Sequence, residues 1–118
     1  MYEGVPYTCT ESAYQAQKTL DKEERLRISK YDPETAKQEG RKLTLRDDWD
    51  NVKLKVMYEI CMIKFTTYPD LKRRLLETGN EELVEGNDWG DTYWGVCDGK
   101  GENHLGKILM RIRSELTA

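Results

Sequence analysis

Four side chains near the amino terminus have the types and the spacing of a catalytic helix face. Glu11, Tyr14, Gln15 and Lys18 lie at helical spacings, so a helix would align them along one side. A carboxylate and an amine on one face can stabilise positive charge, activate water or attack carbon. Charged helix surfaces in solvent also produce such pairs. The uncharged run 13–17 between the two charges favours a buried helix in which both charges are paired or functional.

A second segment, residues 89–113, is typical of a loop built around a ligand, with two tryptophans, three acids and five glycines. Gly101 and Gly106 would let the backbone approach a bound group, and the N–H groups that open the next helix favour an anion. Residues 101–107 match the phosphate-loop pattern Gly-x-x-x-x-Gly-Lys, but Ile108 stands where a hydroxyl must reach magnesium. The pattern argues against a nucleotide triphosphatase. It predicts a diphosphate bound by backbone amides without a metal, or else an ordinary turn capped by Asn103.

Acids and an aromatic platform precede the same helix. Glu85 and Asp91 supply the acids, and Trp94, followed by Gly95, can stack on a nucleobase or a nicotinamide-like ring. The sole histidine, His104, lies in a helix start, where a structural or exposed role is expected, so a Ser-His or Cys-His pair has no other candidate. Catalysis by a carboxylate is the economical assumption, and Glu11 is the first choice.

Several motifs follow one another along the chain in a fixed order. They are Glu11-x-x-Tyr14-Gln15-Ala16-x-Lys18, Lys37-x-x-Gly40-Arg41, Trp49 with Lys53 and Met57, Lys64-Phe65, Leu75-Leu76-x-Thr78-Gly79, Leu83-x-Glu85, Asp91-x-x-Trp94-Gly95, and Gly101-x-Asn103-x-Leu105-Gly106-x-x-Leu109-Met110-x-x-Arg113. Together they resemble the NADAR family, also called YbiA-like N-glycosidases, over nearly the whole chain. One departure concerns the start: family members usually begin with an extra aromatic-rich strand, and here only residues 2–7 precede the first helix.

The resemblance implies a hydrolase that cleaves an N-glycosidic bond, with Glu11 and Lys18 in its active site. In that reading Asp91 or Glu85 would orient ribose hydroxyls. The expected substrate-binding residues are Tyr14, Gln15, Glu85, Asp91, Trp94, Gly95, Gly101, Asn103 and Gly106. Some family members are similar to enzymes that hydrolyse riboflavin-pathway intermediates, and others remove ADP-ribose from modified guanine in nucleic acid. A loop suited to a diphosphate favours ADP-ribose on guanine as the substrate. The alternatives are ribosylaminopyrimidine phosphates of the riboflavin pathway, or a non-catalytic module that binds NAD or ADP-ribose.

Bulk composition narrows the function classes. The chain has 118 residues, which fits one domain over 1–118, and its net charge of −3 gives no basic surface for duplex nucleic acid. Three widely spaced cysteines encode neither a disulfide framework nor a zinc site, and no run is apolar enough for a membrane helix. We expect a soluble, cytoplasmic enzyme without metal or cofactor, acting on a small nucleotide or on ADP-ribosylated nucleic acid. Its oligomeric state is left open.

Caps and periodicity predict a predominantly α-helical α+β domain with a small sheet of short strands. Expected helices cover 11 to about 20, capped by Thr10; 22–29, as a short helix or turn; 33–41, after Asp32; 49–68, opened by Asp47 or Asp48; a short helix capped by Asp70 and ended by Gly79; and a last helix from Asn103. Expected strands cover 2–8, 82–85 and 93–97. The apolar residues that recur at helical spacing on the core face of the long helix are Trp49, Val52, Val56, Ile60 and Ile63, with Met57 beside them. For Trp89, a role as a core anchor alone is left open.

Overall fold

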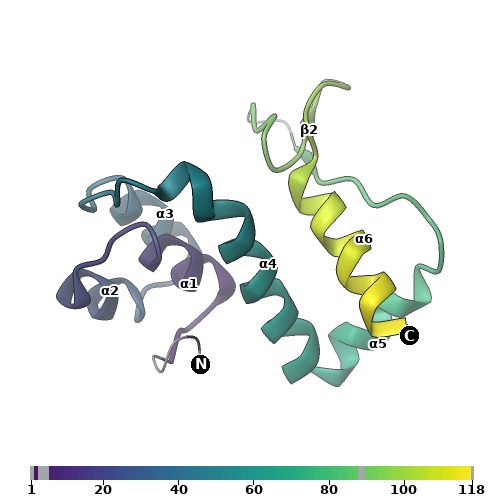
Figure 1. The fold of residues 1–118 in the computed structure, drawn as a ribbon, viewed down its shortest axis with the longest axis horizontal. Coiled ribbons are helices and arrows are strands. Elements are labelled where there is room, and N and C mark those ends of the chain that lie inside the picture. Colours follow the sequence, from purple (N-terminus) through teal and green to yellow (C-terminus); the bar gives the residue numbers. More distant parts are fainter. Residues whose placement is uncertain (1, 3–5, 88–89, 118) are drawn as a thin grey trace. The chain divides into compact units, whose positions relative to one another are not determined.

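The computed structural model describes residue 2 and residues 6–87 and 90–117, so Trp89 lies outside the described residues. The elements in chain order are α1 (Thr10–Ala16), α2 (Lys22–Ile28), α3 (Pro33–Gly40), α4 (Trp49–Thr67), α5 (Pro69–Glu77), β1 (Gly86–Asn87), β2 (Val96–Cys97) and α6 (His104–Thr117) (Figure 1). The chain forms two compact units, Met1–Ile63 and Lys64–Ala118, and α4 runs through the division. The assignment of 1–118 to one domain stays a prediction.

The predicted class, mainly helical with a small sheet, is confirmed. Strands β1 and β2 pair in parallel, Gly86 with Val96 and Asn87 with Cys97. The strand expected at 82–85 is displaced to β1, and the one at 93–97 shrinks to β2. Of the strand expected at 2–8, residue 2 is in a β-bridge, residues 6–8 are not strand, and residues 3–5 lie outside the described residues. Strands of two residues are too short for an alternating pattern to locate, which explains these errors.

In the first unit, α1 packs against α2 and α3. Its core holds Ala16, Ile28 and Ala36, and Tyr7, Tyr31 and Leu43 cover it. Asp21 and Asp32 cap α2 and α3 through side-chain oxygens, and the cap by Asp32 was predicted. The cap predicted for α1 was wrong by one residue. Cys9 occupies that position, because its thiol accepts from the Ser12 amide and the Cys9 amide donates to the Ser12 hydroxyl oxygen.

The long helix α4 begins at Trp49 as predicted and ends at Thr67, two residues before Pro69. Its buried side chains include Trp49, Val56 and Ile60, which are three of the predicted core positions. Among the described residues, no helix combines the length and the apolar composition needed to cross a bilayer.

In the second unit, α5 packs against α6. Tyr68, not Asp70, is the residue before α5, and it provides no side-chain hydrogen bond to the helix. Gly79, with φ of 61°, follows the end of α5, as the sequence indicated. Leu75, Ile108 and Ile112 are buried, and Arg113 donates from Nη1 to the Thr78 hydroxyl at 2.8 Å.

Candidate active site

Glu11 lies in the first turn of α1 and is held by polar neighbours from two helices. Its Oε2 accepts a hydrogen bond of 2.8 Å from Nε2 of Gln15, one turn later on the same helix. Its Oε1 lies 3.8 Å from Nζ of Lys37 on α3, and the Glu11 side chain is 23% exposed. The carboxylate is therefore partly withdrawn from water and oriented, while part of it stays accessible to a substrate.

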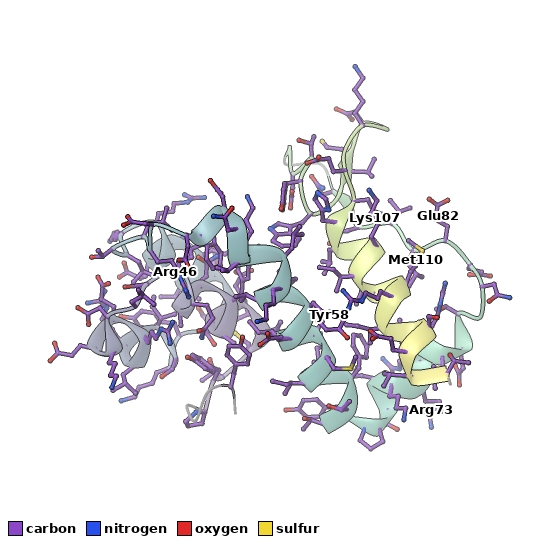
Figure 2. All side chains as sticks on the ribbon, in the orientation of Figure 1. Arg46, Tyr58, Arg73, Glu82, Lys107 and Met110 are labelled. Carbon is purple, nitrogen blue, oxygen red and sulfur yellow. The ribbon has the colours of Figure 1, made fainter. Side chains whose placement is uncertain are left out.

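Lys18 follows α1 in a turn and does not lie on the helix itself. Helix α1 ends at Ala16, and the Lys18 amide donates to the Gln15 carbonyl at 3.1 Å, which continues the chain as a tight turn. The Lys18 carbonyl accepts a bond of 2.7 Å from the amide of Arg46, a residue labelled in Figure 2. This corrects the two-turn helix that the sequence predicted, but the turn still places the Lys18 amine within electrostatic reach of Glu11.

Burial lowers the pKa of the Lys18 amine below its ordinary value of 10.5, and the positive charge of Arg41 lowers it further, while the Glu11 carboxylate opposes both. The amine also lies over the Tyr14 ring, with Nζ 5.7 Å from the centroid. A lysine with a lowered pKa carries more of the neutral, nucleophilic amine at neutral pH.

Tyr14 is a packing residue of α1. It is buried and meets Trp49 edge to face, with centroids 5.3 Å apart. Trp49 thus has the core position that the sequence assigned to it. A substrate contact by Tyr14 stays a prediction.

In the second unit, the amides that open α6 already have partners. The amides of residues 102, 103, 104 and 105 donate to the carbonyls of residues 92, 95, 93 and 94, respectively. An amide already bonded to a carbonyl cannot also bind a phosphate at full strength. These four donors hold the 92–95 loop against the start of α6, and a diphosphate cradle at 101–106 stays a prediction.

The glycines of this region allow close backbone packing. A Cβ on Gly95 would come closer than 3.0 Å to the Glu85 carbonyl, and one on Gly101 would do the same to the Gly95 carbonyl. A Cβ on Gly106 would come equally close to the Leu83 carbonyl and the Asn103 side chain. Their role in this structure is to let three backbone segments meet.

Asn103 and Asp91 organise the same loops. The Asn103 side chain accepts from the Glu85 amide at 2.9 Å and donates to the Leu83 carbonyl at 2.9 Å, with its own φ at 53°. Asp91 accepts from the amides of residues 93 and 94 at 3.1 and 3.0 Å, which is a turn-forming role. Direct contact of either side chain with substrate stays a prediction.

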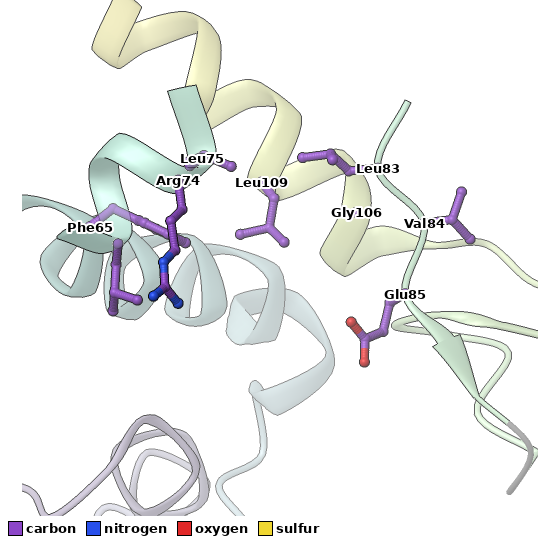
Figure 3. Close-up of a pocket in the computed structure, with 9 residues that line it drawn as sticks. Phe65, Arg74, Leu75, Leu83, Val84, Glu85, Gly106 and Leu109 are labelled. Carbon is purple, nitrogen blue, oxygen red and sulfur yellow. The ribbon is translucent and has the colours of Figure 1, made fainter. Parts of the chain in front are cut away.

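Glu85 borders a pocket of about 300 Å³ within the second unit (Figure 3). The lining is mostly apolar and comprises Phe65, Leu71, Arg74, Leu75, Leu83, Val84, Glu85, Gly106 and Leu109. Figure 3 shows the Arg74 guanidinium and the Glu85 carboxylate with Leu109 drawn between them. An apolar lining with a few charged groups suits a flat, polar-edged molecule such as a nucleobase.

Trp94 and His104 contact Tyr93. Trp94 meets Tyr93 edge to face at 4.9 Å, and the Tyr93 ring lies 4.5 Å from the His104 imidazole. Nε2 of His104 is 3.6 Å from the Glu102 carboxylate, which agrees with a structural role. Stacking of a base on Trp94 stays a prediction.

Each unit gathers its own set of predicted residues. Glu11, Gln15 and Lys18 are neighbours in the first unit, whereas those from Glu85 to Gly106 are grouped in the second. The sequence did not assign a site role to Lys37 or Gly40, which both adjoin the Glu11–Gln15 pair. Their only signal was the Lys37-x-x-Gly40-Arg41 motif. Within the described residues, no three His, Cys, Asp or Glu side chains are grouped to hold a metal ion.

Comparisons with known proteins agree on one family. The model of the NADAR domain matches residues 1–117. The N-glycosidase Npun_R5314 of Nostoc punctiforme is 42% identical over 117 residues, covering 93% of this chain and 74% of that protein. The N-glycosidase YbiA of Escherichia coli is 37% identical over 118 residues, covering 97% of this chain and 73% of that protein.

A plant relative and a solved structure are also similar to this chain. The chloroplastic riboflavin biosynthesis protein PYRR of Arabidopsis thaliana is 47% identical over 72 residues, covering 60% of this chain and 12% of that protein. The NMR structure of the E. coli protein YbiA matches with a TM-score of 0.86 at 37% identity, covering 94% of this chain and 68% of that one. The chain belongs to the NADAR family.

Proposed function

We propose that this chain, an N-glycosidase of the NADAR family, hydrolyses the bond between the anomeric carbon of a ribosyl nucleotide and a nitrogen of its base, with Glu11 and Lys18 as catalytic residues. The observation that carries the proposal is the oriented, partly exposed Glu11 carboxylate within electrostatic reach of an amine whose pKa is lowered. Departure of the base leaves positive charge on the ribose, which a nearby carboxylate stabilises. The same carboxylate can accept a proton from the attacking water.

Lys18 has one of two roles in this scheme. As a hydrogen-bond donor, it fixes a ribose oxygen. As a nucleophile, its neutral amine attacks the anomeric carbon, the bond from that carbon to the base nitrogen breaks, and the base leaves with a proton. The ribosyl-lysine then opens to an imine, and water hydrolyses it to release the sugar and restore the amine. The lowered pKa of Lys18 supports the second role.

The second unit has a pocket of its own beside Glu85. Its volume of about 300 Å³ accommodates a base, and Glu85 can accept from an exocyclic amine at its edge. We propose Glu85 and Trp94 as substrate-binding residues. For Asp91, Gly95, Gly101, Asn103 and Gly106, the hydrogen bonds and close approaches described above support an indirect role, through the shape of the loops.

ADP-ribose attached to guanine is the first substrate to test. The amides at 102–105 bond to carbonyls, so the glycine-rich loop gives ADP-ribose no advantage over a substrate with a single phosphate. The second substrate is a ribosylaminopyrimidine phosphate, favoured by the similarity to the plant riboflavin biosynthesis protein. Both are ribosyl phosphates joined to a base through nitrogen, so both suit the same pair of catalytic residues.

One experiment separates these possibilities. The protein is incubated with an ADP-ribosylated guanine oligonucleotide, NAD, ADP-ribose and the ribosylaminopyrimidine phosphate, and released bases are identified by mass spectrometry. Glu11→Gln should remain folded and lower the turnover at least about a hundredfold. If folded Glu11→Gln hydrolyses the substrate at a near-normal rate, Glu11 is not the catalytic carboxylate. A raised melting temperature without any released base would indicate a binding module.

A further inference from the structure

Gly40, the last residue of α3, lies directly against the side chain of Gln15. A Cβ on Gly40 would come closer than 3.0 Å to Oε1 of Gln15, and it would lie 2.8 Å from Cδ and 3.3 Å from Cβ of that side chain. Gly40 is buried, and its φ lies outside the left-handed region. The position therefore requires glycine for space and not for backbone conformation.

The carboxamide of Gln15 has one satisfied end and one unsatisfied end. Its Nε2 donates to Glu11 at 2.8 Å, whereas its buried Oε1 has no hydrogen-bond partner in the described part of the chain. Gln15 as a whole is 6% exposed. A buried acceptor without a hydrogen-bond partner lowers stability, so hydrogen bonding alone does not explain why the Gln15 side chain takes this position. Exchanging the two ends would place oxygen against the carboxylate and would be worse.

We infer that Gly40 and Gln15 are positioning residues that orient the Glu11 carboxylate for catalysis. Gly40 leaves the space that the carboxamide occupies, the carboxamide presents its N–H to Oε2 of Glu11, and the carboxylate is thereby held in one orientation. This inference rests on the proposed catalytic role of Glu11. It adds Gly40 to the active site and gives Gln15 a role through Glu11, in place of the substrate contact expected from the sequence.

The atoms around Gly40 explain why replacing it with alanine should lower activity more than stability. The nearest obstacle to a Cβ is the far end of a flexible side chain, which can rotate away. Around Gly95, Gly101 and Gly106, in contrast, the nearest atoms are backbone carbonyls, which cannot. Gly40→Ala should therefore fold and displace the Gln15 carboxamide from Glu11.

A double-mutant cycle tests the inference, with hydrolysis of both candidate substrates as the assay. Gly40→Ala and Gln15→Ala should each lower kcat by roughly ten- to a hundredfold with little change in KM, which is the signature of a misplaced catalytic group. Because Gln15→Ala removes the obstructing atoms, adding Gly40→Ala to it should cost nothing more. Gln38→Ala, at an exposed position of the same helix, is the matched control and should keep the normal rate.

A second measurement needs no substrate. In the ¹⁵N-labelled protein, the side-chain amide signals of Gln15 should move when Glu11→Gln is introduced. Gly40→Ala should abolish this response, while Gln38→Ala keeps it. Additive losses in the cycle, or a response that survives Gly40→Ala, overturn the inference. A rise in KM alone does so too, since it marks a substrate contact. If Glu11→Gln retains activity, the proposed function fails, whatever the amide signals show.

Discussion

Gly106→Ala should destabilise the second unit strongly, because α6 begins against backbone that cannot yield. The added Cβ would come closer than 3.0 Å to the Leu83 carbonyl oxygen and to both terminal atoms of the Asn103 side chain. Relief requires α6 or the 83–85 segment to move, and overpacking of this kind costs about 1–3 kcal/mol. Movement also breaks the two Asn103 hydrogen bonds of 2.9 Å, at about 1 kcal/mol each.

Alanine recovers part of this loss, because it favours a helix over glycine by about 1 kcal/mol. The net fall in the free energy of unfolding is then roughly 2–4 kcal/mol. For a chain of this length, this loss of free energy corresponds to a melting temperature lower by about 8–16 °C. Gly86→Ala is the matched control, since a Cβ there meets nothing within 4 Å. Its unfolding free energy should change by less than about 0.5 kcal/mol.

Urea titration and thermal unfolding followed by circular dichroism measure both variants. The reasoning is refuted if Gly106→Ala melts within about 2 °C of the parent protein. It is also refuted if Gly106→Ala keeps its stability and loses only ligand binding, because that result would return the glycine to a ligand cradle.

Three further predictions concern Lys18 and the need for a metal ion. When the protein is treated with ADP-ribose and borohydride, which reduces an imine, a ribosyl-nucleotide mass should appear on the peptide that contains Lys18. Lys18→Ala should abolish both this adduct and most of the turnover. If Lys18→Ala loses turnover but the parent protein forms no adduct, the imine route is excluded. Arg41→Gln removes a positive charge that lowers the pKa of Lys18, so this pKa should rise. When the rate of Lys18 labelling by an amine reagent is measured against pH, the midpoint of the curve should move to higher pH. An unchanged or lower midpoint contradicts the electrostatic account. A chelator should leave hydrolysis unchanged, because Ile108 replaces the hydroxyl that would hold magnesium, and a strict need for magnesium would disprove this.

Features encoded by neighbours in sequence could be read without a structure. The periodic apolar positions of α4, the Asp32-Pro33 start of α3 and the Gly79 stop after α5 all depend on residues within about one helical turn of each other. The α1 cap was missed because serine, threonine and aspartate are the usual caps, and a thiol does this only with the help of Ser12.

The family and the candidate catalytic pair were likewise accessible from ordered motifs and their spacing. Glu11 and Lys18 are only seven residues apart, so a helix or a turn brings them near one another. For the same reason, Lys18 stays within electrostatic reach of Glu11 although α1 ends at Ala16 and Lys18 lies in the turn after it.

Contacts between distant segments were decided by the tertiary structure alone. The amides at the start of α6 looked free because a sequence shows donors but not the carbonyls of residues 92–95 that fold back to meet them. Gly40 and Gln15 are 25 positions apart, and nothing local reveals that one lacks a side chain so that the other can fill the space. The same glycine pattern serves a phosphate-binding loop and close backbone packing. Whether a ligand or another backbone segment fills the space beside the glycines is decided only when the chain has folded.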